Sequence, residues 1–311
     1  MDRYLCGIDG GGTTTSVVVC NQSGNIIGSF RAGSINQYGI GTEKVVEEYQ
    51  WIHDRLISIL GRLPDAVYIG SSALDGQATD EEAHAMTGGI FKSVRLCIHS
   101  DVYIALLGFS QGKQGAILIS GTGSMACGID SQGCYHTSGG WGQTLGDEGS
   151  GYHLALEGIQ AALRGYDGVS ESTVLTQKVM DFFHLKRMTE IIDLFYNPPL
   201  EKSKIAAFAT VVESAALDGD PVAMRLLDNE IDWLCKLALS ITSKCKVTAI
   251  GMYGSMLVKS PVIGKRLGER LRKEGIEAGY PRFRPETGAL FGAFRLLGIP
   301  LTPEVLSGME P

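Results

Sequence analysis

The sequence predicts an α/β protein made of two related domains, and three observations support this class. A short apolar strand, Tyr4–Ile8, leads into a glycine loop, a β-branched strand, a turn and a third strand. The same order of elements recurs between residues 115 and 136. Helical patterns of apolar residues alternate with further apolar strands along the rest of the chain. Each domain is expected to open with a strand–turn–strand unit that offers a loop to a central cleft.

In the first domain, the expected second and third strands are Thr15–Cys20 and Ile26–Arg31, with a turn at residues 21–24. A helix is expected from an N-cap at Thr42 to a glycine stop at Gly61. Its apolar residues recur at alternating spacings of four and three, at Val45, Tyr49, Ile52, Leu56 and Ile59. Buried strands are expected at residues 66–70 and 95–98, and a helix containing residues 104–109 follows.

The second domain repeats the opening unit and then becomes rich in helices. Strands are expected at residues 115–120, 125–129 and 134–136, and later at 247–252. Helices are expected at residues 150–164, 206–217 and 286–297, and one runs to about residue 244 from an Asp220 cap with Pro221 in its first turn. The expected domains are therefore residues 1–110 and 111–311. An alternative for the last helix is that it packs on the first domain.

Composition narrows the function classes. The chain has 311 residues, a net charge of −7 and no run of Lys and Arg, which argues against a nucleic-acid partner. Seven cysteines form no C-x-x-C pair, as expected for reduced thiols in the cytoplasm. No apolar stretch is long enough to span a membrane, and the N-terminus has no signal-peptide pattern. The six histidines show no metal-ligand spacing, and no G-x-S-x-G or Cys–His signature supports a hydrolase.

The glycine loop after the first strand has two interpretations. Successive backbone N–H groups from Gly10 to Gly12 favour an anion such as phosphate, and the hydroxyls of Thr13 and Thr14 add donors. The alternative is a tight β-hairpin with no ligand. No lysine follows, so this is not the usual nucleotide-binding P-loop, and the next residues favour a strand over a helix. The second loop, G-T-G-S at 121–124, favours the phosphate interpretation.

Four side chains are candidates for chemistry, and each has a structural alternative. Asp9 is a candidate Mg²⁺ ligand or a turn cap. Asp101, after an apolar strand, is a candidate general base or a helix N-cap. Trp141, within G-G-W-G, offers a flat apolar face to a ligand or packs on the core. Asp147 is a candidate ligand residue or stabilises a helix N-terminus.

Taken in order, seven segments resemble the N-acetylglucosamine kinase family, part of the BadF/BadG/BcrA/BcrD-type ATPases in the actin-like sugar-kinase superfamily. They are GIDGGGTTT (7–15), AGSINQYG (32–39), SDVYIAL (100–106), ISGTGSMACG (119–128), GGWGQTLGDEGSGY (139–152), GMYGSML (251–257) and PETGALFGA (285–293). They span nearly the whole chain, and GGWG…GDEGS is the most specific of them. The resemblance implies two ribonuclease-H-like domains around a central cleft, with ATP between the two glycine hairpins.

The resemblance also implies a role for individual residues. Asp101 would be the base that acts on the sugar hydroxyl. The residues implied for ATP are Gly11, Gly12, Thr13, Thr14, Thr122, Gly123, Gly254 and Ser255. Those implied for the sugar are Asn36, Asp101, Ser124, Gly140, Trp141 and Asp147.

The resemblance therefore implies an ATP-dependent kinase acting on N-acetylglucosamine at its 6-hydroxyl, with ATP and Mg²⁺ as cofactors. Glucosamine and N-acetylmuramic acid are the alternative substrates. Two other classes stay open: an ATPase activator of a dehydratase, which would hold an iron–sulfur cluster, and a non-catalytic actin-like sugar sensor. The expected partners are ATP and a small amino sugar, and neither a nucleic acid nor a membrane is expected. A homodimer is the candidate assembly.

Overall fold

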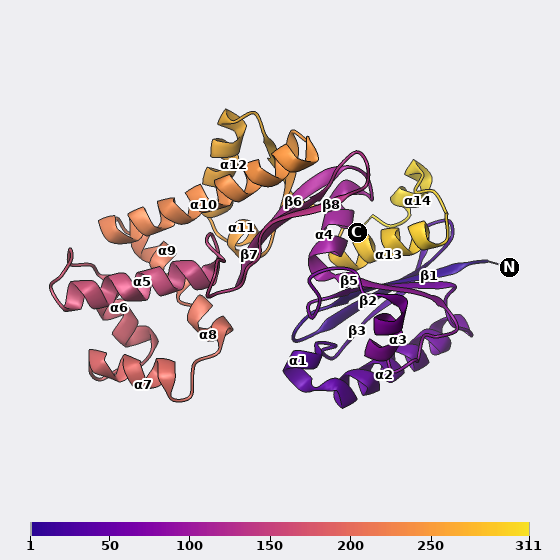
Figure 1. Cartoon of the computed structure of the whole chain (residues 1–311), viewed down its shortest axis with the longest axis horizontal. Coiled ribbons are helices and arrows are strands. Elements are labelled where there is room, and N and C mark those ends of the chain that lie inside the picture. The colour runs from indigo at the N-terminus through magenta and orange to yellow at the C-terminus, as the bar shows by residue number, and fades with distance from the viewer. Residues whose placement is uncertain (1, 311) are drawn as a thin grey trace. The chain divides into compact units, whose positions relative to one another are not determined.

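The chain divides into two units in the computed structural model, which describes residues 2–310 (Figure 1). The first unit comprises Met1–Gly115 and Tyr280–Pro311, and the second comprises Ala116–Gly279. The contacts thus divide the chain five residues after the predicted boundary and group the final segment with the first unit. The domain limits predicted from sequence remain a prediction.

The first unit is built on a five-stranded sheet in the order β3-β2-β1-β4-β5. Its strands are β1 (Tyr4–Gly10), β2 (Thr15–Asn21), β3 (Ile26–Ala32), β4 (Ala66–Ser71) and β5 (Arg95–Ser100). The first three strands pair antiparallel, as short hairpin connections require, whereas β4 and β5 run parallel to β1. The carboxyl ends of β1, β4 and β5 therefore share one edge of the sheet.

Helices cover both faces of this sheet, and the alternation of side chains along each strand explains why. Leu5 joins the apolar cluster that contains α13 (Pro285–Leu296) and α4 (Asp101–Ser110), whereas Cys6 joins the cluster that contains α2 (Thr42–Leu60) and α3 (Asp80–Met86). The buried face of α2 is formed by Val45, Tyr49, Ile52 and Leu56, as predicted. Burying each of these side chains contributes roughly 1.5–3 kcal/mol.

Glycines let α13 approach the first unit's other elements closely. A Cβ atom on Gly7 of β1 would lie 2.2 Å from the Glu286 carbonyl oxygen, and one on Gly288 would lie 2.0 Å from that of Ile104 in α4. On Gly292, a Cβ would meet the Tyr68 ring at 2.5 Å. No real Cβ tolerates such distances, so these glycines are required by helix packing.

The second unit repeats the sheet of the first. Its strand order, β8-β7-β6-β9-β10, matches β3-β2-β1-β4-β5 position by position. The strands are β6 (Gly115–Ser120), β7 (Ser124–Ile129), β8 (Tyr135–Gly139), β9 (Ala249–Tyr253) and β10 (Glu277–Gly279). As in the first unit, β9 runs parallel to β6, and β10 runs parallel to β9. The order of elements that recurs around the two glycine loops therefore reflects a repeated sheet topology.

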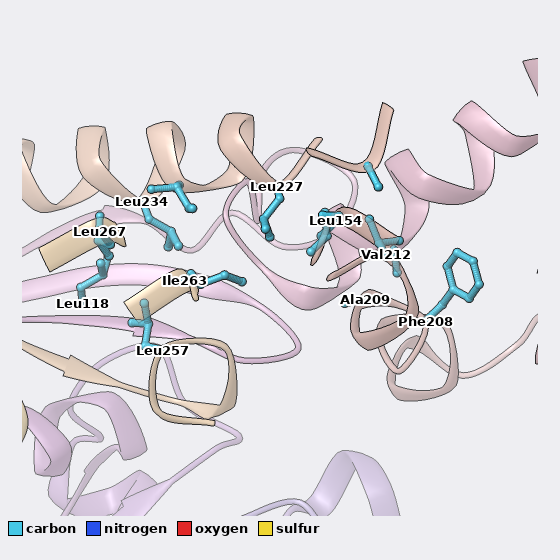
Figure 2. Packing of buried hydrophobic residues seen from close by; sticks show 14 of the residues in the cluster. Leu118, Leu154, Phe208, Ala209, Val212, Leu227, Leu234, Leu257, Ile263 and Leu267 are labelled. Carbon is cyan, nitrogen blue, oxygen red and sulfur yellow. The ribbon is translucent and has the colours of Figure 1, made fainter. Parts of the chain in front are cut away.

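The core of the second unit lies between this sheet and long helices. Leu118 of β6, Leu234 of α10 (Pro221–Cys245) and Leu267 of α12 (Ile263–Lys273) belong to one apolar cluster (Figure 2). The cluster continues through Leu154 of α5 (Gly151–Tyr166) and Val212 of α9 (Ala209–Leu217). The remaining helices are α1 (Gln37–Ile40), α6 (Leu175–Phe182), η1 (Met188–Glu190), α7 (Ile191–Tyr196), α8 (Lys202–Ala206), α11 (Ser255–Val258) and α14 (Pro303–Ser307).

Two local expectations differ from the structure. The N-cap of α2 is Gly41, with Thr42 already helical, and no side chain caps that end. The helix expected over residues 206–217 begins three residues later, as α9, because α8 ends at Ala206 and residues 207 and 208 separate the two helices. Helix α10 does begin after its expected cap, Asp220, and α5 begins after a Ser150 cap, one residue from its expected start. Within residues 2–310, no helix has the length and apolar character needed to cross a membrane.

Candidate active site

The first glycine loop is a tight, exposed connection between β1 and β2. The Gly11 N–H donates to the Thr14 carbonyl oxygen at 3.1 Å, and a Cβ on Gly11 would lie 2.9 Å from the same oxygen. Gly12, Thr13 and Thr14 are exposed, and a Cβ on Gly12 would meet no atom within 4 Å. The loop therefore leaves open space and two hydroxyls where the sequence predicts phosphate.

Asp9 and Asp101 lie at the shared edge where the parallel strands of the first unit end. Burial, together with the charges of Asp101 and Glu286, raises the pKa of Asp9 to about 7. Among residues 2–310, no hydrogen bond to the Asp9 carboxylate is found, so nothing supports its interpretation as a turn cap. A half-buried carboxylate that lacks a compensating partner favours a cation.

Asp101 is the first residue of α4 and not its N-cap. Ser100 occupies the cap position, where its hydroxyl accepts a hydrogen bond from the Tyr103 N–H at 3.3 Å. The structural alternative for Asp101 is therefore wrong. Burial raises the pKa of the Asp101 carboxyl, and the charge of Asp75 adds to this rise, while a 2.7 Å hydrogen bond from the Val102 N–H opposes it.

Asn36 lies beside the first loop and is connected to it through two serines. Its side-chain amide donates to the Ser72 hydroxyl at 3.0 Å, and its side-chain oxygen accepts from the Tyr38 N–H at 3.0 Å. The Ser34 hydroxyl accepts from the Asn36 N–H and donates to the Gly11 carbonyl oxygen. These bonds fix the amide orientation and leave one donor and one lone pair for a ligand.

The second glycine loop is attached to the G-D-E-G-S segment of the second unit. The Ser120 hydroxyl donates to the Gly149 carbonyl oxygen, and the Ser124 hydroxyl donates to that of Glu148, each at 2.6 Å. The Gly121 carbonyl oxygen accepts from the Gly151 N–H at 2.8 Å. The second glycine loop and the G-D-E-G-S segment, which are separate motifs in the sequence, are thus joined by hydrogen bonds.

Asp147 lies beneath this second loop and has a partner that the sequence did not reveal. Its side chain is 5% exposed, its φ of +64° is in the left-handed region, and Lys202 of α8 lies 2.6 Å from its Oδ2 atom. A Cβ on Gly123 would lie 3.2 Å from the same carboxylate. Asp147 precedes α5, and Ser150 provides the side-chain cap of that helix. The alternative role of Asp147, as a negative charge near the helix N-terminus, stays a prediction.

Trp141 does not pack on the core, so the interpretation of Trp141 as a core-packing residue is wrong. The side chain is 73% exposed, and Gly140 and Gly142 on either side have φ values of +79° and +81°. Only glycine adopts such values readily, so the loop turns sharply on both sides of the indole. An indole exposed in this way is suited to contact a ligand.

A cavity of about 270 Å³ in the second unit brings predicted ATP residues together. Thr122 and Ser255 both line it, and Gly254 directly precedes Ser255. Gly254 has a φ of +98°, and a Cβ there would lie 2.3 Å from the Ser120 carbonyl oxygen. The opposite wall comes from α8 and α9, through residues such as Ala206 and Thr210. No motif identified this helical wall, since its small residues also fit an ordinary helix.

The predicted site residues therefore form two sets, one in each unit. The first unit holds Asp9, Gly11, Gly12, Thr13, Thr14, Asn36 and Asp101; the second holds Thr122, Gly123, Ser124, Gly140, Trp141, Asp147, Gly254 and Ser255. The roles proposed for them remain predictions. Lys202 and Glu286 were not predicted from the sequence. Lys202 shows only a charge within a short helix, and Glu286 lies in the PETGALFGA segment without a predicted role.

A glycine hairpin at the head of each of two identically ordered sheets defines a chain with two actin-like ATPase halves. The BadF/BadG/BcrA/BcrD ATPase family model matches residues 6–293, and the chain belongs to this family. The predicted family and fold class are thus confirmed, and membership implies the use of ATP.

Curated relatives cover most of the chain. An N-acetylmuramic acid/N-acetylglucosamine kinase of Clostridium acetobutylicum is 32% identical over 72% of this chain and 74% of its own length. An N-acetyl-D-glucosamine kinase of Dictyostelium discoideum is 28% identical over 78% of this chain and 80% of its own. The glucosamine kinase GspK of Vibrio cholerae is 32% identical over 72% of this chain and 76% of its own.

Solved structures support the same fold. A crystal structure from Chromobacterium violaceum has a TM-score of 0.70 at 24% identity and covers 93% of this chain and 98% of that one. The ROK hexokinase of Thermus thermophilus has a TM-score of 0.59 at 16% identity and covers 94% of this chain and 97% of that one. At these identities the likeness shows the fold alone.

Proposed function

We propose that this chain is an ATP-dependent amino-sugar kinase that phosphorylates the 6-hydroxyl of N-acetylglucosamine. The names of the curated relatives agree with this function. The observation that carries the proposal is Asp101: a half-buried carboxylate at a strand end, where Ser100 and not Asp101 caps the helix. A carboxylate with a raised pKa in this position suits a general base.

In the proposed reaction, Asp101 accepts the proton of the sugar 6-hydroxyl as that oxygen attacks the γ-phosphorus of ATP. A bond forms between the sugar oxygen and phosphorus, the bond to the β,γ-bridging oxygen breaks, and ADP leaves. Phosphoryl transfer depends mainly on positioning and charge neutralisation. Thr13, Thr14 and Thr122 are proposed to orient the phosphates, while Asn36, Ser124, Gly140, Trp141 and Asp147 bind the sugar.

Mg²⁺ is proposed at Asp9. The uncompensated charge there fits a cation, and Mg²⁺ prefers carboxylate and water oxygens. No three His, Cys, Asp or Glu side chains in the described part of the chain form a metal cluster. Most ligands would therefore be water and phosphate oxygens, and the ion would supply charge neutralisation.

The experiment is an ADP-release assay across N-acetylglucosamine, N-acetylmuramic acid, glucosamine and glucose, with the phosphorylated carbon of the product identified by NMR. N-acetylglucosamine is expected to give the highest kcat/KM. Preference for unacetylated glucosamine would transfer the assignment to that sugar, as the name of the Vibrio relative suggests. ATP binding without turnover of any sugar would favour a sensor, and a brown protein would favour a dehydratase activator.

Assembly and location also remain predictions. A homodimer is proposed, and light scattering coupled to size exclusion tests it through the molar mass relative to the 33.3 kDa chain. A cytoplasmic location is proposed from the composition, and fractionation of the source cells tests it.

A further inference from the structure

Glu213 is a buried carboxylate in the wall of the cavity beside the second glycine loop. It lies on α9, one helical turn after Thr210, which lines the same cavity. Its side chain is 8% exposed. Glutamate is seldom buried to this extent unless its oxygens have partners.

Only part of this carboxylate is used within the protein. Oε1 accepts a hydrogen bond from the Ser260 hydroxyl, and no other hydrogen bond or ion pair to Glu213 is found among residues 2–310. An ionised carboxylate has about four acceptor positions. Buried polar groups are normally satisfied, so acceptor capacity that opens into a cavity indicates a bound donor.

The cavity is continuous with the loop proposed to bind phosphate. Thr122 and Ser255 line it together with Glu213, so a nucleotide held by its phosphates at Thr122 would direct its nucleoside into this space. Alanines line part of the wall, and a flat base packs well on such small side chains. This step depends on the proposed function, because it uses the phosphate role of Thr122.

We propose that Glu213 is a specificity-determining residue for the phosphoryl donor, accepting a hydrogen bond from the nucleoside. A carboxylate can only accept, so it favours a donor such as the adenine amino group or a ribose hydroxyl. It disfavours guanine, which carries a carbonyl oxygen where adenine carries the amino group. A nucleoside that places an acceptor there leaves the buried carboxylate unsatisfied, which strengthens the discrimination.

The competing explanation is that Glu213 only anchors Ser260. The Ser260 hydroxyl also accepts hydrogen bonds from the N–H groups of Val262 and Ile263, at 3.2 and 2.8 Å, where α12 begins. Loss of Glu213 would then act through the position of α12. Two variants separate these roles: Glu213→Gln keeps an acceptor for Ser260, whereas Ser260→Ala removes the anchor and keeps the carboxylate.

The test measures equilibrium binding and kcat/KM for ATP, GTP and 2′-deoxy-ATP in wild type, both variants and the control Glu269→Gln. Glu269 lies exposed on α12, outside the cavity lining. Wild type and the control should favour ATP over at least one analogue by about tenfold to a hundredfold, the worth of a hydrogen bond to a charged group. Glu213→Gln should lose most of that preference for ATP. Ser260→Ala should retain the preference but have a lower melting temperature.

A smaller ATP/GTP ratio in Glu213→Gln places the contact at the base, and a smaller ATP/2′-deoxy-ATP ratio places it at the ribose. Three results would overturn the proposal. These are unchanged ratios in Glu213→Gln, a wild type that does not prefer ATP over either analogue, and a loss of preference in Ser260→Ala as large as that in Glu213→Gln. Selective nucleotide binding without sugar phosphorylation would refute the kinase function and leave the role of Glu213 standing.

Discussion

Lys202 places its ammonium group 2.6 Å from the buried carboxylate of Asp147, 55 residues earlier in the chain. The lysine side chain is 33% exposed and that of Asp147 is 5% exposed, so solvent reaches the lysine but hardly the carboxylate. Lys202 also lies over the Tyr152 ring, 5.6 Å from its centroid. The pair connects α8, which contributes to the cavity wall, to the segment beneath the second glycine loop.

Lys202→Met should lower both the stability of the second unit and its affinity for sugar. Without the ammonium group, Asp147 is a buried charge without a cation, which costs about 1–3 kcal/mol for a pair that solvent partly reaches. Thermal unfolding and the sugar KM measure the two effects. Lys204→Met is the matched control, since Lys204 is exposed two residues along the same helix. Equal behaviour of the two variants would show that the ion pair contributes nothing.

Most of the fold could be predicted because its signals are local. The alternation of apolar residues places the strands, and the spacing of Val45, Tyr49, Ile52 and Leu56 places α2. The break between α8 and α9 could not be predicted, since the segment is helix-favouring throughout and tertiary packing decides where it bends. The requirement for glycine at position 288 could not be predicted either. It arises from tertiary packing, because a Cβ atom there would collide with the carbonyl oxygen of Ile104, which is distant in sequence.

The candidate site could be predicted where the chain concentrates glycines and polar residues in short motifs. Asp101 and Asp147 are found in this way. Lys202 and Glu213 lie in helices whose sequences have no such motif, and only the fold brings them to the second loop and the cavity. Glu286 lies in the PETGALFGA segment, but that segment does not show that its charge acts on Asp9. The structure also decides between alternatives that local sequence leaves equal, as when Ser100 takes the cap position that Asp101 could have filled.

Asp101→Asn should lower kcat by about 10²–10⁴-fold, the usual contribution of a general base. The amide still accepts the Val102 N–H, so α4 should keep its start and the sugar KM should change only a few-fold. Steady-state kinetics with N-acetylglucosamine measure both constants. Asp80→Asn, at an exposed position in α3, is the control. Retention of more than about a tenth of wild-type kcat would contradict the base assignment.

Gly288→Ala should strongly destabilise the first unit. Its new Cβ would lie 2.0 Å from the Ile104 carbonyl oxygen and 2.7 Å from the Gly108 nitrogen, so α13 and α4 must separate. Overpacking of this kind costs about 1–3 kcal/mol or more. Gly268→Ala in α12 is the control, because its Cβ would meet nothing within 4 Å, and it should raise stability by about 0.5–1 kcal/mol. Denaturant unfolding of both variants measures the contrast, and similar losses would contradict it.

The His153–Glu230 pair should make stability depend on pH. A hydrogen bond from the imidazole to Glu230, at 2.7 Å, raises the pKa of His153 above 6.5, and the charges of Glu157 and Glu148 act in the same direction against burial. A raised folded-state pKa stabilises the protein below the unfolded value, and this stabilisation disappears as the pH rises through the folded value. Melting temperatures measured from about pH 6 to 9 should therefore fall more for wild type than for His153→Gln. Parallel curves would exclude the pair as the source.

Trp141→Ala should leave stability nearly unchanged and reduce sugar phosphorylation selectively. Because the indole is 73% exposed, its removal opens no cavity, and the free energy of unfolding should change by less than about 0.5 kcal/mol. We expect this apolar face to contact the acetyl methyl group of the sugar. The loss should therefore be larger for N-acetylglucosamine than for glucosamine or glucose.

Recognition of one such group contributes about 1–3 kcal/mol, so kcat/KM for the acetylated sugar should fall about tenfold to a hundredfold relative to glucose. Asp147→Ala is the comparison, since loss of a carboxylate that binds ring hydroxyls should weaken all three sugars alike. Trp233→Ala, 40% exposed on α10, controls for removal of a surface indole. Equal losses on the three sugars for Trp141→Ala would remove the acetyl-binding role, because a general disturbance of the loop does not distinguish an amide from a hydroxyl.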